Sequence, residues 1–249
     1  MSKTHCPGCG APFQSDKPGE PGFLPPEARE RETPICRRCY KLKHYGQLES
    51  FGRSNQRIRD TVHKTGHELD LAVLVVDLFD LEGSLHQEWR KLINSPVLLA
   101  LNKVDLLPKR TPVDEVIEAA TKISRARIPD LQWKEVIAVS AETGTGLLQL
   151  KERMIYRRGR NHRIGFFGVT NTGKSSLLSR FLPLDQSRPT ISNRPGTTQG
   201  ATSWYVTDDD LTLIDTPGWV PGTRLTDLLC PDCSGKLIVK SKIISKYLD

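Results

Sequence analysis

The sequence contains no apolar run approaching the roughly 18 residues that a membrane-spanning helix requires, so we expect no membrane span. Its beginning, MSKTHCPGCG, lacks the apolar segment of a secretory signal and passes directly into cysteines. The chain also contains neither an internal repeat nor a low-complexity tract. These absences argue against an integral membrane protein and a repeat array, and they favour a cytoplasmic globular protein.

Hydrophobic residues are few for a globular chain, at 37% of 249 residues, yet they suffice for a packed core. This length fits one large domain, or a medium domain joined to a small one. The 36 basic and 29 acidic residues leave a net charge of +7. Such a moderate basic excess favours a polyanionic partner but does not establish one.

All six cysteines fall in three C-x-x-C pairs, which are Cys6/Cys9, Cys36/Cys39 and Cys230/Cys233. In a cytosolic chain such pairs indicate metal binding more often than disulfides. The four thiolates of the first two pairs suit a closed, tetrahedral zinc site. The 26 residues between these pairs exceed the usual spacing of about 15 to 20, but they are rich in Pro, Gly and charge and are expected to form a loop. Thiols without metal are the alternative.

The surroundings of the cysteines leave two questions open. Basic residues flank the second pair together with Tyr40 and Tyr45, which fits either a surface that contacts RNA or a solvated basic face. The third pair, Cys230/Cys233, could bind metal alone, pair with another chain or exchange with one of the first pairs.

From residue 70 onward, apolar strands alternate with amphipathic helices. Strands rich in β-branched residues, each followed by a loop, are predicted within 70–80, 96–106, 134–144 and 162–173. Helices are predicted over 46–66, 84–93, 113–127, 146–158 and 174–182, with Ser84 as a candidate N-cap. Two strands joined by an acidic turn at 208–210 are predicted within 201–218. This alternation predicts an α/β fold, a mostly parallel sheet with helices on both faces.

Residues 168–175, GVTNTGKS, match the phosphate-loop pattern G-x-x-x-x-G-K-[ST] between a predicted strand and a predicted helix. The glycines allow backbone N–H groups to turn toward phosphate oxygens, and the helix beginning near Lys174 directs its positive end at the anion. We expect the Lys174 ammonium to bridge the outer phosphates and the Ser175 hydroxyl to bind Mg²⁺. A glycine-containing turn with a chance lysine is the alternative.

Two later segments carry groups suited to the terminal phosphate. Asp215 ends the strand of LIDTPGW, where it can hold the Mg²⁺ shell, and Gly218 can offer its N–H to the γ-phosphate. Asp-x-Pro-Gly alone is ordinary turn chemistry, but its place 40 residues after the phosphate loop strengthens the interpretation. Thr197 or Thr198, in RPGTTQG, could complete the Mg²⁺ shell, and a flexible turn is the alternative for either.

The segment 102–105, NKVD, carries groups that can distinguish guanine from adenine. Guanine presents two adjacent donors, N1–H and N2–H₂, and one carboxylate, here Asp105, accepts both. Adenine would leave that carboxylate unpaired, which disfavours ATP. Asn102 can tie the loop down, and the stem of Lys103 can lie along the base or ribose. In VSAETG, which also ends a strand, the Ala141 N–H can reach the guanine O6. Loops without a ligand are the alternative for both segments.

The order of these segments differs from that of a Ras-like GTPase, which has the phosphate loop, P-G-T-T and D-T-P-G before the other two. One rotation converts one order into the other, as a circular permutation predicts, with the join at 156–163. The strand ends lie at one sheet edge, so chain order does not matter to the site. The predicted nucleotide contacts are Asn102, Lys103, Asp105, Ser140, Ala141, Asn171, Thr172, Gly173, Lys174, Ser175, Ser176, Thr197, Thr198, Asp215 and Gly218. The predicted magnesium ligands are Ser175, Thr198 and Asp215.

With this order, the chain resembles the circularly permuted GTPases of the YqeH type, which carry a zinc-finger-like segment before the permuted domain. The stretches CPGCGAPFQ, CRRCYKLKHYGQ and VVDLFDLEGS are also similar to signatures of that family. The resemblance covers residues 5–235. It implies GTP hydrolysis coupled to assembly of the small ribosomal subunit, with that subunit or its rRNA as partner. Organellar relatives make an organelle the alternative to the cytoplasm.

Four segments follow from the motifs and the resemblance. They are a zinc-finger-like, zinc-ribbon-like module at 1–48, a connecting segment at 49–68, the permuted GTPase domain at 69–225 and a short basic tail at 226–249. Family members continue past D-T-P-G into a further domain, whereas this chain stops at 249, so it is truncated, a variant or a fragment. The third cysteine pair does not fit the family pattern.

Trp219 stands where Ras-type enzymes have the glutamine that orients the attacking water. Because tryptophan cannot do this, catalysis must depend on charge neutralisation and positioning by Lys174, Thr198, Gly218 and Mg²⁺. The resemblance implies that a potassium ion supplies the positive charge that an arginine finger supplies elsewhere, with Asn171 as a ligand of this ion. The alternative is that Asn171 is an asparagine that merely tolerates a left-handed backbone. We expect slow hydrolysis that K⁺ or a ribosomal partner accelerates.

Three functions compete at this point. The leading one is a ribosome-assembly GTPase. A GTP-sensing, RNA-binding adaptor with negligible hydrolysis is favoured by the missing glutamine and the short C-terminus. A P-loop ATPase or kinase is disfavoured by Asp105. The sequence does not determine the oligomeric state.

Overall fold

The computed structural model describes residues 4, 6, 12–18, 22–29, 34–37, 40, 52–183, 201–228, 237–239 and 241–243. The predictions for Cys9, Cys39, Thr197, Thr198, Cys230 and Cys233 lie outside these residues. The chain divides into two compact units, one of residues 1–55 and 225–238, the other of residues 56–224 and 239–249.

The first unit has little regular structure in its described part. A 3-10 turn, η1, spans Pro26–Ala28, a bridge joins Gln14 to Phe23, and helix α8 spans Leu225–Leu228. Cys6 and Cys36, from the two N-terminal cysteine pairs, are buried together against Phe13 and Ile35. The Cys36 N–H donates to the Cys6 Sγ at 3.3 Å, so one member of each pair lies beside the other.

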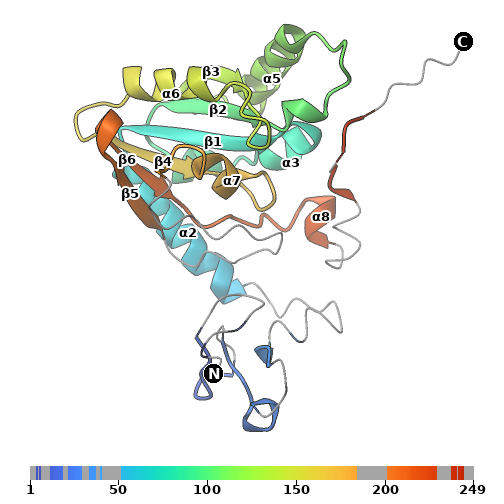
Figure 1. Cartoon of the computed structure of the whole chain (residues 1–249), viewed down its shortest axis with the longest axis vertical. Coiled ribbons are helices and arrows are strands. Elements are labelled where there is room, and N and C mark those ends of the chain that lie inside the picture. The colour runs from blue at the N-terminus through green and yellow to red at the C-terminus, as the bar shows by residue number, and fades with distance from the viewer. Residues whose placement is uncertain are drawn as a thin grey trace, which may run out of the picture. The chain divides into compact units, whose positions relative to one another are not determined.

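The second unit is built on a six-stranded sheet (Figure 1). The strands are β1 Leu71–Asp77, β2 Val97–Asn102, β3 Trp133–Ala138, β4 Arg163–Phe167, β5 Thr202–Val206 and β6 Leu211–Asp215. Their order is β3-β2-β1-β4-β6-β5, and only β5 runs antiparallel to its neighbour. The central strand β1 is buried along its whole length, as expected for a run of apolar residues covered on both faces.

Helices cover both faces of this sheet. They are α2 Gly52–His67, α3 Leu81–Ser84, α4 Trp89–Leu92, α5 Val113–Arg127, α6 Leu147–Tyr156 and α7 Lys174–Leu178. Short 3-10 turns are η2 Leu78–Asp80, η3 Val104–Leu106 and η4 Thr207–Asp209. Side chains of α2, α4 and α5 pack with one face of the sheet, and those of α6 and α7 pack with the other. The predicted α/β fold, with a mostly parallel sheet between two helical layers, is therefore confirmed.

The prediction of one helix over 84–93 with Ser84 as its N-cap is wrong. Ser84 ends α3, and its hydroxyl accepts the N–H of Asp77 at 3.2 Å. A second short helix, α4, begins at Trp89, whose indole N–H donates to the Ser84 carbonyl at 3.0 Å. The buried Leu85 lies between the two helices. Tertiary contacts of Ser84 and Trp89 thus replace the local helical pattern.

Among the described residues, no helix is both long and apolar enough to span a bilayer.

Candidate nucleotide-binding site

The predicted nucleotide loops follow the carboxyl ends of neighbouring strands. Asn102 ends β2 and pairs in register with Asp77 at the end of β1. Lys103 then adopts a left-handed conformation, with φ 73°, and Asp105 lies in η3. Ser140 and Ala141 follow β3, whose partner strand is β2. The base-reading segments are therefore brought to one edge of the sheet.

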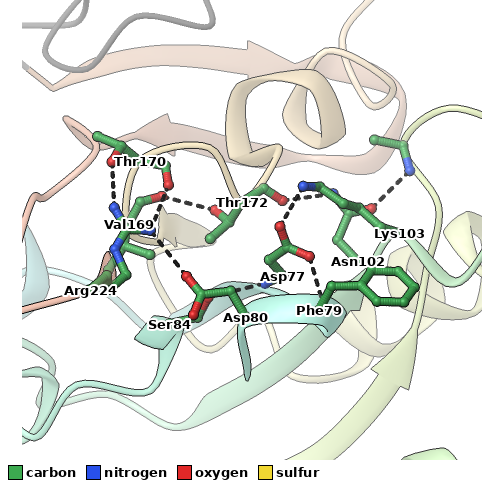
Figure 2. A network of polar contacts seen from close by, with 11 residues as sticks. Asp77, Phe79, Asp80, Ser84, Asn102, Lys103, Val169, Thr170, Thr172 and Arg224 are labelled. Carbon is green, nitrogen blue, oxygen red and sulfur yellow. Dashed lines mark hydrogen bonds and ion pairs between the residues drawn. The ribbon is translucent and has the colours of Figure 1, made fainter. Parts of the chain in front are cut away.

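The Asn102 side chain joins the two base-reading loops to the phosphate loop. Its Nδ2 donates to the Thr172 carbonyl at 2.8 Å, although the two residues are 70 positions apart. Its Oδ1 accepts the Ala141 N–H at 3.0 Å. Figure 2 shows Asn102 pointing at Thr172. The Ala141 N–H, predicted to reach guanine O6, is thus bonded to Asn102 in this structure.

The phosphate loop runs from β4 into α7 and contains two residues with positive φ, Asn171 at 69° and Gly173 at 84°. A Cβ at Gly173 would lie 2.4 Å from Asn102 Nδ2, so this position requires glycine for its conformation and for the close approach. The Thr172 hydroxyl donates to the Val169 carbonyl at 3.0 Å. The loop is therefore held by contacts of its own and by Asn102.

Lys174, Ser175 and Asp215 form a polar cluster at the end of β6. The Lys174 ammonium makes an ion pair with Asp215 and donates to the Thr216 carbonyl, and both charged side chains are buried, at 6% and 1% exposure. The Ser175 hydroxyl donates to the other Asp215 oxygen at 3.1 Å. Hydroxyl and carboxylate oxygens are ligands that Mg²⁺ accepts, so this pair of side chains fits the ion.

The D-T-P-G segment packs against the phosphate loop. The Thr170 N–H donates to the Trp219 carbonyl at 3.0 Å, and the Trp219 N–H donates to the Gly168 carbonyl at 3.3 Å. A Cβ at Gly218 would lie 3.3 Å from the Thr170 side chain, so Gly218 is also close to this loop. The two segments are therefore neighbours, and a ligand held by one is adjacent to the other.

The Trp219 side chain belongs to the hydrophobic core. It is 4% exposed, and its ring meets the edges of Trp89 and His86, with centroids 5.4 and 4.7 Å away. This buried ring therefore cannot orient a water molecule as an exposed glutamine amide would.

Two contacts of the site were not anticipated from the sequence. The Lys103 ammonium pairs with Asp77, whose carboxylate also accepts the Phe79 N–H at 3.0 Å. The buried Arg224 binds Thr170 of the phosphate loop (Figure 2). The strand-end position of Asp77 could have signalled the first contact, because all other strand ends of this edge carry site residues. No local pattern marks Arg224.

The remaining predicted residues lie at the same edge with different surroundings. Asp105 is half-buried, and its carboxylate shows no hydrogen bond or ion pair to the residues that the structure describes. Ser140 is fully buried, and its hydroxyl accepts the Thr143 N–H at 3.0 Å, which shapes the loop. Ser176, in α7, is half-buried.

Comparison with known proteins identifies related chains. Residues 163–242 match a family described as 50S ribosome-binding GTPase. YqeH of Bacillus subtilis is 32% identical over 223 residues, covering 88% of this chain and 60% of that protein. NO-associated protein 1, chloroplastic/mitochondrial, of Arabidopsis thaliana is 27% identical over 247 residues, covering 87% of this chain and 44% of that protein. The structure of YjeQ from Thermotoga maritima is 22% identical, with a TM-score of 0.38 over 61% of this chain and 48% of that one.

The strand order and the loops at one sheet edge, together with the family match, define a circularly permuted P-loop GTPase domain. The similarity to YqeH and to NO-associated protein 1 then supports a permuted GTPase of the YqeH type. The chain spans 60% and 44% of the length of these two relatives.

Proposed function

We propose that this chain binds GTP at the carboxyl edge of its sheet and hydrolyses it to GDP and phosphate, coupled to assembly of the small ribosomal subunit. The observation that supports this most directly is the Asn102 amide, which bonds the phosphate loop at Thr172 and the second base-reading loop at Ala141. One nucleotide can therefore reach base-reading and phosphate-reading groups together.

Guanine recognition is assigned to Asp105. Its half-buried carboxylate is available to accept the N1–H and N2–H₂ donors together. Asn102 holds the neighbouring loops in place, and Ser140 stabilises the turn that presents Ala141. An adenine ring would offer that carboxylate no such pair of donors.

Phosphate and magnesium binding are assigned to the other loops. The residues 171–176 surround the phosphates, and Lys174 exchanges its contact with Asp215 for the outer phosphate oxygens. Ser175 and Asp215, with Thr198 as a third proposed ligand, would hold Mg²⁺, which neutralises the charge that develops on the phosphoryl oxygens.

Hydrolysis requires water to attack the γ-phosphorus while the bond to the bridging oxygen of GDP breaks. Because Trp219 is buried in the core, the chain must accelerate this step by positioning, through Lys174 and the Gly218 N–H. We propose Asn171 as a ligand of a potassium ion that adds positive charge there. Its φ of 69° also agrees with the alternative of a loop residue that tolerates a left-handed backbone. Hydrolysis rates with and without potassium distinguish the two.

The base assignment is tested by competition between nucleotides. The wild-type chain should bind GDP and not ADP, whereas Asp105→Asn should lose this preference and accept xanthosine diphosphate, whose C2 carbonyl can pair with an amide. Equal binding of GDP and ADP by the wild type would refute guanine recognition. Hydrolysis rates measured in KCl and in NaCl test the proposed role of potassium. Equal rates in the two salts would refute that role.

A GTP-sensing adaptor with negligible hydrolysis is the second candidate, favoured by the burial of Trp219. Single-turnover hydrolysis with and without ribosomal subunits separates it from the first. Stimulation by the small subunit supports the GTPase, and binding without hydrolysis in every condition supports the adaptor.

The ribosomal partner is tested by co-sedimentation with isolated small and large subunits, with a GTP analogue or GDP. We expect association with the small subunit in the GTP state, weakened steeply by salt because the contacts are to RNA phosphates. The matching family is described as 50S ribosome-binding GTPase, so binding to the large subunit alone is the competing outcome, and it would refute the assignment. The compartment is proposed to be the cytoplasm, and the name of the Arabidopsis relative makes an organelle the alternative.

Zinc binding by Cys6, Cys9, Cys36 and Cys39 is also proposed. The proximity of Cys6 and Cys36, with an N–H donated to sulfur, fits a thiolate site because such bonds stabilise metal-bound sulfur. Native mass spectrometry should show one zinc per chain, lost when Cys6 and Cys36 are both replaced by serine. A chain without metal would refute the site, and zinc retained by that variant would show that the metal does not need Cys6 and Cys36.

A further inference from the structure

Arg224 is the last residue of the second unit before α8, and it is buried although it carries a charge. Its guanidinium donates to the Thr170 carbonyl at 3.0 Å and to the Thr170 hydroxyl at 2.7 Å. A third partner, the carboxylate of Asp80, lies 3.6 Å away. Figure 2 shows the side chain directed at the phosphate loop from the side of Asp80.

The contact of Arg224 with the Thr170 carbonyl also orients the N–H of the next residue. In a planar trans peptide, the carbonyl of one residue and the N–H of the next point in opposite directions. A donor that holds the Thr170 carbonyl therefore turns the Asn171 N–H away from Arg224. By the same reasoning, Asn102 holds the Thr172 carbonyl and turns the Gly173 N–H away from itself.

The backbone N–H groups of the loop fall into two classes. The Thr170 N–H is bonded to the Trp219 carbonyl. The Asn171 and Gly173 N–H groups, which follow the two captured carbonyls, show no hydrogen bond to any residue in the described part of the chain. Unbonded N–H groups in a loop with left-handed residues are the donors that bind a phosphate anion.

We propose that Arg224 is a positioning residue for phosphate binding: it fixes the Thr170–Asn171 peptide so that the Asn171 N–H is presented to the nucleotide. This inference rests on the proposed function, because it assumes that the phosphate loop binds a nucleotide. Arg224 acts from behind the loop and does not itself touch the phosphates.

The planar fork of the guanidinium is essential to this role. Two N–H groups reach the carbonyl and the hydroxyl of one residue at the same time, while the charge remains near Asp80. A lysine could retain the charge but has a flexible stem and no fork, so it would not fix the peptide in one orientation. Lysine therefore separates positioning from simple attraction between the positive charge and the phosphates.

The test compares GDP affinity of the full chain with those of Arg224→Met and Arg224→Lys. Both variants are expected to weaken GDP binding by about tenfold to a hundredfold, the range that one or two hydrogen bonds to a charged group represent. In the absence of nucleotide, amide hydrogen exchange of Thr170, whose N–H is bonded to the Trp219 carbonyl, should be faster in both variants, because the Thr170 carbonyl and side chain are no longer held.

Arg127→Met is the matched control. Arg127 also donates to a main-chain carbonyl, that of Leu85 at 3.0 Å, and contacts a carboxylate, that of Glu82 at 3.2 Å, but it touches no phosphate-loop residue. It is expected to lower the melting temperature with GDP affinity unchanged.

Three results would overturn the inference. They are wild-type affinity in Arg224→Met, wild-type affinity in Arg224→Lys, which would leave only a charge effect, and an equal loss in the Arg127 control, which would indicate general destabilisation. If Arg224→Met does not fold, the lysine variant and its hydrogen exchange decide the question. Failure of the wild type to bind any guanine nucleotide is a distinct outcome, which refutes the proposed function and the inference with it.

Discussion

Replacing Asn102 with alanine is expected to loosen both base-reading loops and the phosphate loop at once. The residue is 2% exposed, and its amide satisfies the Thr172 carbonyl and the Ala141 N–H. Removal leaves one buried and one partly buried backbone group without partners, each at a cost of about 1–3 kcal/mol, or roughly 2–6 kcal/mol in all. In a domain of this size, about 2–4 °C of melting temperature corresponds to each kcal/mol, so we expect a fall of about 4–24 °C.

The two assays are thermal unfolding without nucleotide and GDP affinity by titration. GDP affinity should fall along with stability, because the loop that binds phosphate and the loop beside the base lose their common support. The matched control is Asn161→Ala, which removes an exposed amide whose Nδ2 lies 3.3 Å from the Asp70 carboxylate at the opposite edge of the sheet. Its effect on stability should stay within about 0.5 kcal/mol.

The variant Asn102→Asp separates the contact with the phosphate loop from the contact with the base-reading loop at Ala141. An aspartate keeps an oxygen for the Ala141 N–H but has no donor for the Thr172 carbonyl, and it buries a charge. It should therefore weaken GDP binding at least as strongly as alanine. Unchanged melting temperature and unchanged GDP affinity in Asn102→Ala would refute the claim that this amide holds the site together.

Three further predictions follow from buried or paired groups. Lys174→Met leaves the Asp215 carboxylate buried without its cation and should lower the free energy of unfolding by about 3–5 kcal/mol. Adding Asp215→Asn should recover this stability, as measured by chemical denaturation, but should not recover binding of Mg²⁺-GDP. Trp219→Gln should lose about 3–5 kcal/mol of stability without faster single-turnover hydrolysis, since this side chain points into the core; a faster rate would contradict this. The Asp210 carboxylate accepts the Tyr205 hydroxyl at 2.9 Å and raises the pKa of Tyr205, so Asp210→Asn should lower that pKa in an ultraviolet titration. Stability from the raised pKa is present below the pKa of Tyr205 in the unfolded chain and is lost as pH rises through the folded value.

The sheet could be predicted from the sequence because its strands carry strong local signals. The run LAVLVVD has β-branched and apolar residues at every position before Asp77, and the structure buries all of it. The helix over 113–127 has the same bounds in the structure, since its apolar period and its charged first and last turns agree. In these elements local preference and tertiary packing favour the same conformation.

The sequence was least informative where a side chain bonds to a residue outside its own helix or loop. Ser84 looked like an N-cap, but its hydroxyl is used by Asp77, which no local pattern reveals. Arg224 was not singled out from the sequence, yet it is buried and bonds to Thr170, 54 positions earlier. Such contacts depend on the closed fold, so propensity and spacing cannot indicate them.

The join between the two halves of the permuted domain explains why the changed order does not disturb the site. The segment 157–162 connects α6 to β4 at the amino edge of the sheet, away from the loops that follow β2, β3, β4 and β6. There the Asp70 carboxylate, just before β1, accepts the N–H groups of Arg160, Asn161 and Arg163 at 3.1–3.2 Å. The join is thus fixed by its own contacts, and the nucleotide edge is assembled by strand pairing and by Asn102 across 70 positions of sequence. A site built from strand ends depends on which strands are neighbours, and a cyclic shift of the chain leaves those neighbours unchanged.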